Sequence, residues 1–222
     1  MYYFPKVKFC GLANYEDVAC ACEQQAYWAG FIFVKGSSRY INIEKSKTII
    51  SLFKNQIKFV GVFVNPSNEY IKMGINAGID YIQLHGEETP QRCKEIKNIF
   101  NIPIIKAISV FKEIDLKAIE VYSSVCDYFL FDTKNENKNG YNGGTGKTFD
   151  WNIIRNNQLW LDKQKPWILS GGLNINNIEE AIKYTGTKAV DVSSGIEYNL
   201  GIKSKELMQM FAHKTKNIEN KV

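Results

Sequence analysis

The feature that most constrains the fold of this chain is a series of eight short apolar segments at roughly even spacing. Each is rich in β-branched or aromatic residues, and several are apolar at nearly every position. The segments span residues 7–10, 30–34, 58–64, 81–85, 102–108, 127–132, 166–171 and 188–195. Continuous apolar runs of this length are typical of strands buried on both faces, so the pattern predicts eight strands of a parallel sheet.

Helix-forming segments lie between the predicted strands, and several carry start signals. Asn14 and Thr89 are good N-cap residues before amphipathic stretches, and Pro90 occupies a favourable first helical position. Asp150 and Asn174 are predicted to begin two later helices. The chain therefore alternates strands with helices along its length.

The last predicted helix lies in residues 203–214, where Leu207, Met210 and Phe211 are expected to face inward. A strand followed by a helix, repeated eight times, predicts an α/β fold of the (β/α)₈ TIM-barrel type. The main alternative is an open doubly wound sheet with the same order of elements, but eight units favour closure. No break in composition marks a second domain, so residues 1–222 are predicted to form a single domain.

The composition excludes several classes of protein. The net charge is +5, and the basic residues are scattered instead of forming the dense patch of a nucleic-acid-binding domain. No apolar run approaches a membrane span, and the first residues lack the apolar core of a signal peptide. The 5 cysteines are irregularly spaced, which indicates free thiols. We therefore expect a cytoplasmic protein that binds neither nucleic acid nor membrane.

Three polar residues near the carboxyl ends of predicted strands are candidates for chemistry, because the active site of such a barrel lies there. Cys10 ends the first strand, Arg39 follows the second and Asp132 ends the sixth. Cys10 could act as a base in its thiolate form, and Asp132 as an acid in its protonated form. Equally, Cys10 could be a small core residue, Asp132 a helix cap and Arg39 part of a surface ion pair. In a site, Arg39 would pair with a substrate carboxylate.

Two glycine-containing turns predict a phosphate site. Gly171 and Gly172 end the seventh predicted strand, and Ser194 and Gly195 end the eighth. The loops after these two strands often bind phosphate in such barrels, because glycines let backbone N–H groups approach an anion closely.

The segment GGTGKTFDW at residues 143–151 looks like the end of a nucleotide-binding P-loop. That motif requires a glycine five positions before Gly146, where this chain has Tyr141. A polar stretch also separates the segment from the sixth predicted strand, whereas a P-loop leaves its strand directly. We therefore predict a long loop over residues 133–149 and no binding of nucleoside triphosphates.

Gln83 and His85 close the fourth predicted strand, where they could be catalytic or could simply line the wall of the site. The chain has only 2 histidines and no C-x-x-C pair. These residues give no set of ligands for a metal, so we expect no metal site.

Eight motifs together resemble those of the phosphoribosylanthranilate isomerase family. They are VKFCGL, GFIFVKGSSRYI, FVGVFVN, YIQLHGEE, FDT, GGTGKTFDW, SGGLNINNIEEAI and VDVSSGIE, in the family's order over nearly the whole chain. The resemblance implies isomerisation of N-(5-phosphoribosyl)anthranilate to 1-(o-carboxyphenylamino)-1-deoxyribulose 5-phosphate, a step of tryptophan biosynthesis. In this family the reaction is an Amadori rearrangement that uses acid–base catalysis without a metal or organic cofactor.

The resemblance also implies roles for individual residues. Cys10 corresponds to the general base and Asp132 to the general acid, while Arg39 is expected to hold the anthranilate carboxylate. The residues expected to cradle the phosphate are Gly171, Gly172, Ser194 and Gly195. The expected partner is a small phosphoribosyl substrate, and the oligomeric state stays open between monomer and homodimer.

The sequence departs from the family pattern at a few positions. Ala13 stands where threonine is usual, and Ser38 replaces a proline in the loop that carries Arg39. A serine restricts that loop less than a proline would, which bears on affinity more than on activity. The alternatives are another phosphosugar-processing barrel enzyme and a non-catalytic barrel that binds phosphorylated metabolites. The presence of both Cys10 and Asp132 favours the isomerase.

Overall fold

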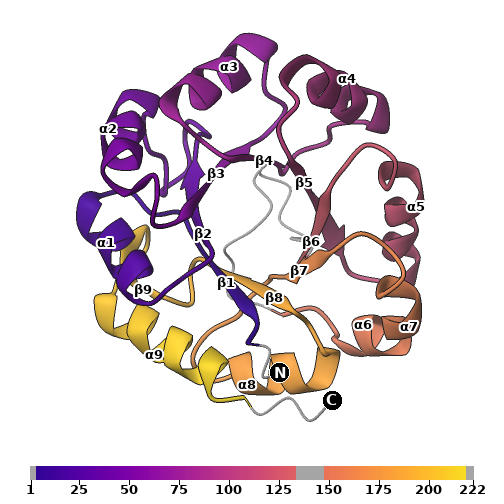
Figure 1. Ribbon diagram of the computed structural model, residues 1–222. Helices are drawn as coiled ribbons and strands as arrows, with labels where there is room; N and C mark the ends of the chain where they lie inside the picture. The colour runs from indigo at the N-terminus through magenta and orange to yellow at the C-terminus, as the bar shows by residue number, and fades with distance from the viewer. Residues whose placement is uncertain (1–3, 134–147, 219–222) are drawn as a thin grey trace.

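The computed structural model describes residues 4–133 and 148–218. At its centre eight parallel strands follow one another in sequence order and form a closed barrel, with β8 pairing back to β1 (Figure 1). The strands are β1 (Lys6–Cys10), β2 (Trp28–Ile32), β3 (Lys58–Phe63), β4 (Tyr81–Leu84), β5 (Ile104–Val110), β6 (Tyr128–Thr133), β7 (Trp167–Leu169) and β8 (Ala189–Val192). The closed (β/α)₈ barrel is therefore confirmed over the open sheet.

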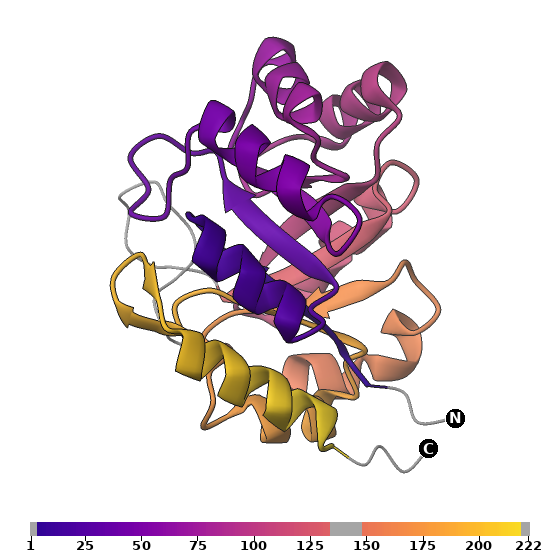
Figure 2. The same cartoon turned by 60° about the vertical axis from the view of Figure 1, so that its left-hand side comes forward.

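Helices cover the outside of the barrel (Figures 1 and 2). They are α1 (Tyr15–Glu23), α2 (Ile43–Phe53), α3 (Asn68–Ala77), α4 (Pro90–Phe100), the 3₁₀ helix η1 (Glu113–Lys117), α5 (Ala118–Tyr122), α6 (Asn152–Asn156), α7 (Gln158–Leu161), α8 (Ile178–Thr185) and α9 (Lys205–Lys216). Two predicted caps are confirmed, since the side chains of Asn14 and Thr89 accept hydrogen bonds from the first turns of α1 and α4. Asp150 likewise accepts from the backbone N–H of Asn152 at the start of α6.

Side chains of strand β1 point alternately toward the outer helices and into the barrel. The ring of Phe9 meets that of Phe211 on α9 edge-on, with centroids 6.2 Å apart. Because side chains alternate along a strand, Lys8 and Cys10 point the other way, into the barrel. The interior is filled elsewhere by a cluster with one buried residue from each of six strands: Trp28, Val60, Ile105, Leu130, Ile168 and Ala189.

Two local predictions about helices are wrong. Helix α8 begins at Ile178 and not directly after Asn174, because Asn174 closes a turn in which its N–H donates to Asn177 Oδ1. On α9, Met210 is 47% exposed, whereas Met208 is fully buried together with Phe211. Residues 208 and 210 lie about 200° apart around a helix, so only one of them can face the barrel.

No helix in residues 4–133 and 148–218 combines the length and apolar character that a membrane span needs.

The corrected face of α9 can be tested by paired substitutions. Met208→Ala should lower the free energy of unfolding by about 2–5 kcal/mol, because it leaves a cavity between α9 and the barrel. Met210→Ala is the matched control and should change it by no more than about 0.5 kcal/mol. Urea denaturation measures both, and equal losses would show that α9 is turned differently on the barrel.

Candidate active site

A cavity of about 360 Å³ opens at the carboxyl ends of the strands. The residues around it come from most of the strand ends and from the loop after β2. Six of the seven residues predicted for the site line it: Cys10, Arg39, Asp132, Gly171, Gly172 and Ser194. Gln83 and His85 line it as well. The fold thus brings the proposed base, acid and anion-binding groups into one cavity.

Gly195 does not line the cavity but joins its two glycine turns. It forms a parallel bridge with Asn174, and a Cβ atom at position 195 would collide with the carbonyl oxygen of Leu173. Only glycine allows this close approach of the turn after β8 to the turn after β7. Its place in the fold therefore supports a spacing role more directly than a contact with phosphate.

The turn after β7 is built on two glycines in a left-handed conformation. Gly171 and Gly172 have φ values of +85° and +66°, which favour glycine. The carbonyl of Gly172 accepts hydrogen bonds from the side-chain amides of Asn174 and Asn177, at 3.1 and 3.0 Å. Because a trans peptide holds its N–H opposite its C=O, these bonds direct the N–H of Leu173 the other way. Such a turn suits an anion.

Cys10 sits above a buried ion pair. Lys8, fully buried on the same face of β1, donates to Asp191 Oδ1 across 2.7 Å. The other carboxylate oxygen of Asp191 accepts from Ser170 Oγ at 3.1 Å. Asp191 and Ser170 also line the cavity, so a paired cation and anion stand beside the thiol.

These charges act on the Cys10 thiol in opposite directions. Burial raises the pKa of Cys10, and the Asp191 carboxylate adds to that rise, whereas the Lys8 cation favours the thiolate and opposes it. Burial also works against the charge of Lys8, but attraction to Asp191 and Cys10 outweighs it and raises the pKa of Lys8 above its ordinary value. Lys8 is therefore a permanent cation at neutral pH.

Asp132, the last residue but one of β6, lies between two polar groups. Its Oδ1 accepts from the N–H of Thr133 at 2.8 Å. Its Oδ2 lies 3.2 Å from His85 Nε2, an ion-pair distance, although the two atoms lack the alignment of a hydrogen bond. Gln83 Nε2 is 2.9 Å from His85 Nδ1. Because the Gln83 amide nitrogen can only donate, Nδ1 accepts in this contact, which leaves a ring N–H on Nε2, the atom nearer Asp132.

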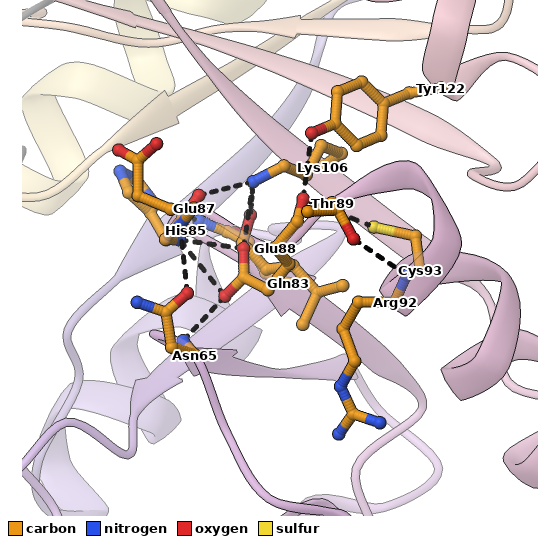
Figure 3. A network of polar contacts seen from close by, with 12 residues as sticks. Asn65, Gln83, His85, Glu87, Glu88, Thr89, Arg92, Cys93, Lys106 and Tyr122 are labelled. Atoms are coloured by element: carbon orange, nitrogen blue, oxygen red, sulfur yellow. Dashed lines mark hydrogen bonds and ion pairs between the residues drawn. The ribbon is translucent and has the colours of Figure 1, made fainter.

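The loop that begins with His85 after β4 is anchored by a buried ion pair between Glu88 in the loop and Lys106 on β5 (Figure 3). Lys106 Nζ lies 2.9 Å from Glu88 Oε2 and donates to the carbonyl of Gly86 at 2.7 Å. Glu88 Oε1 accepts from the N–H of Asn65, at the end of the neighbouring β3 region, at 2.7 Å. This network links three consecutive strands behind the cavity and stabilises the segment that presents His85 to Asp132.

Arg39 is already engaged with a carboxylate of the protein. Its Nε and Nη2 donate to the two oxygens of Glu197 at 2.7 and 2.8 Å. The side chains of Arg39 and Glu197 are 10% and 5% exposed, so this pair does not lie on the open surface. Arg39 therefore combines features of both predicted roles: it forms an ion pair within the protein, and it also lines the cavity, where it could contact a substrate.

Sequence reasoning missed several charged residues of this region: Lys8, Asp191, Glu197 and Lys203. A signal was available for the first two, since each is a charge inside an otherwise apolar strand. Such a charge must be paired when it is buried, which points to the barrel interior. Glu197 and Lys203 lie beyond the last predicted strand, where a charge carries no such signal.

The predicted long loop lies almost wholly outside the described residues, which resume at Thr148. Among the described residues no three His, Cys, Asp or Glu side chains are grouped as metal ligands. All five cysteines are free, and Cys20, Cys93 and Cys126 are buried in packing positions, with Cys22 partly buried.

Comparison with known proteins places the chain in a family. A model of the N-(5′-phosphoribosyl)anthranilate isomerase family matches residues 7–214. An N-(5′-phosphoribosyl)anthranilate isomerase of Thermoanaerobacter sp. is 40% identical, covering 96% of this chain and 98% of the relative. One from Rhizobium rhizogenes is 37% identical over 93% of this chain and 92% of the relative.

Solved structures agree with this result. The crystal structure of phosphoribosyl anthranilate isomerase from Thermotoga maritima superposes with a TM-score of 0.85 at 37% identity, covering 96% of this chain and 98% of the other. A structure of the isomerase in complex with reduced 1-(o-carboxyphenylamino)-1-deoxyribulose 5-phosphate superposes with a TM-score of 0.81 at 33% identity, over 96% and 98%. The chain belongs to the N-(5′-phosphoribosyl)anthranilate isomerase family.

Proposed function

We propose that this chain isomerises N-(5-phosphoribosyl)anthranilate to 1-(o-carboxyphenylamino)-1-deoxyribulose 5-phosphate in tryptophan biosynthesis, with Cys10 as general base and Asp132 as general acid. The observation that carries the proposal is that both residues line the same cavity as the glycine turns after β7 and β8. A sugar held by its 5′-phosphate at those turns has a thiol and a carboxyl group within one enclosed space.

The first step is opening of the furanose ring. Protonated Asp132 gives its proton to the ring oxygen, the bond from C1′ to that oxygen breaks, and the nitrogen lone pair forms a Schiff base at C1′. The N–H of Thr133 and the His85 ring both face the Asp132 carboxylate that remains. The Thr133 hydrogen bond stabilises the negative charge that appears on Asp132 in this step, and the nearby His85 ring adds to it electrostatically.

The second step is removal of a proton from C2′. The Cys10 thiolate takes this proton, and the electron pair of the C–H bond moves toward the Schiff-base nitrogen to give an enolamine, which tautomerises to the ketone. The substrate nitrogen accepts the electrons, so this sequence requires neither a metal nor an organic cofactor. Lys8 supports the step, because its cation favours the thiolate form of Cys10.

The two anionic groups of the substrate have separate partners in this proposal. The phosphate is assigned to the backbone N–H groups of the turns at Gly171, Gly172 and Ser194, with Gly195 holding these turns together. The anthranilate carboxylate is assigned to Arg39. The isomerase from Thermotoga maritima is described as dimeric, and for this chain we propose a monomer or homodimer that acts in the cytoplasm.

The acid and base assignments predict the behaviour of two variants. Cys10→Ser and Asp132→Asn should each lower kcat by on the order of 10²-fold or more, the effect of losing a positioned acid–base group. The rate is measured from the decrease in fluorescence as the substrate is consumed. Matched controls are Cys22→Ser, a helix cysteine remote from the cavity, and the exposed Asp162→Asn, which should keep normal rates. Near-normal turnover by either site variant would remove that residue from its role.

Lys8 and Asp191 act on the pKa of Cys10 in opposite directions, so substitutions of the two residues should have opposite effects on the thiol. Lys8→Met removes the cation that favours the thiolate, so the pH midpoint for alkylation of Cys10 by iodoacetamide should move upward. Asp191→Asn removes an anion that disfavours the thiolate, so the midpoint should move downward. In Lys8→Met, kcat/KM at pH 7 should fall and recover as the pH is raised.

Both substitutions break the same buried pair and both destabilise the barrel. Destabilisation alone would therefore move the two alkylation profiles in the same direction. Cys22, measured in the same samples, reports any general change in thiol access. Shifts of equal sign would show that Lys8 and Asp191 do not act on Cys10 through their charges.

A further inference from the structure

A small hairpin follows the barrel and lies against the site. Strands β9 (Glu197–Asn199) and β10 (Ile202–Lys203) pair antiparallel and belong to no part of the eight-stranded barrel. Figure 2 shows this hairpin on the same side of the molecule as the loop after β2 and away from the two termini. At its tip Gly201, with φ +79°, packs so closely on Ser38 that a Cβ atom would collide with the Ser38 carbonyl. The hairpin therefore braces the loop that carries Arg39.

The first residue of the hairpin grips Arg39 through a fork of two hydrogen bonds. Glu197 occupies Nε and Nη2 of the guanidinium, at 2.7 and 2.8 Å. This two-point contact fixes the plane of the guanidinium and leaves Nη1 as the nitrogen that Glu197 does not use. Burial opposes the charge of Glu197, but the Arg39 and Lys203 contacts outweigh it and hold the pKa of Glu197 below its ordinary value.

The last residue of the hairpin connects this pair to the general base. Lys203 Nζ, with a fully buried side chain, donates to Glu197 Oε1 at 2.7 Å and to the Ser193 carbonyl at 3.0 Å. The hydroxyl of Ser193 in turn donates to the backbone carbonyl of Cys10 at 3.0 Å. The stem of Arg39 also passes directly over Gly11, where a Cβ atom would lie 2.9 Å from Arg39 Cδ. Arg39 is thus positioned relative to the end of β1 from two sides.

We propose that Glu197 and Lys203 are positioning residues for recognition of the substrate carboxylate: Glu197 aims Arg39 into the cavity, and Lys203 offsets the charge of Glu197. The inference rests on the proposed function, because it assumes that Arg39 meets the carboxylate. Burial lowers the pKa of Lys203, and the Glu197 carboxylate opposes that fall. With Arg39 and Lys203 protonated and Glu197 ionised, the three side chains carry two positive charges and one negative charge. The cluster therefore keeps a net charge of about +1, which attracts an anion, whereas an Arg39–Glu197 pair alone would be neutral.

The test compares KM and kcat for N-(5-phosphoribosyl)anthranilate in a set of variants. Glu197→Gln leaves both cations in place but loses the two-point contact that aims Arg39. We expect the lost aim to outweigh the added positive charge, so KM should rise roughly tenfold, as for the loss of one charge-assisted hydrogen bond, while kcat changes by less than about threefold. Glu197→Asp keeps the charge but shortens the side chain and should fall between Glu197→Gln and the natural chain. The matched control is Glu23→Gln, which breaks an exposed ion pair with Lys205 on the outside of the barrel.

The double variant Arg39→Ala/Glu197→Gln separates positioning from a purely structural role. If Glu197 acts through Arg39, its substitution should add nothing to the rise in KM that Arg39→Ala already causes. A full additional rise in the double variant would show a structural effect and overturn the inference. If Arg39→Ala raises KM but Glu197→Gln does not, the inference fails and the assignment of Arg39 stands. If Arg39→Ala leaves KM unchanged, the carboxylate assignment itself fails.

Lys203→Met provides a second readout that does not depend on Glu197 variants folding well. It makes the cluster electrically neutral, so KM should rise and should depend less on salt concentration than in the natural chain, because screening then has less attraction to remove. Melting temperatures confirm that the compared proteins are folded. An unchanged salt dependence of KM in folded Lys203→Met would overturn the charge-offsetting role.

Discussion

The interaction on which the site depends is the buried pair of Lys8 and Asp191. It joins β1 to β8, the two strands whose pairing closes the barrel, and it does so within the interior. Burying two charges costs free energy that apolar residues of the same size would not, so a pair of this kind is poor evidence for stability alone. We propose that its place beside Cys10 gives it a chemical role, because the buried Lys8 cation favours the thiolate, whereas burial and Asp191 raise the pKa of Cys10.

The fold could be predicted from the sequence because the same physical rule shapes all eight strands. A strand covered by helices outside and by side chains inside has no wet face, so its apolar run is continuous and easily recognised. One strand was displaced by two residues, predicted at 30–34 and found at Trp28–Ile32, because the apolar stretch here runs from Tyr27 to Val34 and does not itself mark the ends of the strand. Met210 was misplaced because α9 has methionines two residues apart, and only packing decides which one is buried.

The site could be predicted only in part. Cys10, Asp132 and the glycine turns were found because they lie at the ends of predicted strands, and strand ends form the active-site face of such a barrel. Their residue types alone would not have marked them as site residues. The partners of these residues are distant in sequence: Lys8 meets Asp191 across 183 positions, and Arg39 meets Glu197 across 158. No local pattern encodes such pairs. The first pair follows from the register of β1 with β8, which exists only once the barrel is closed, and the second from the packing of the β9–β10 hairpin on the loop after β2.

Each charged pair around the cavity lies beside a different residue of the site. Lys8 with Asp191 lies beside Cys10. Glu88 with Lys106 holds the segment that carries His85 next to Asp132, and Glu197 with Lys203 contacts Arg39. Because these partners are already in place around the cavity, we propose that the groups facing the substrate need little reorganisation when it binds. Arg39, Asp132 and Asp191 line the cavity, and each of these charged groups has a partner beside it in the wall.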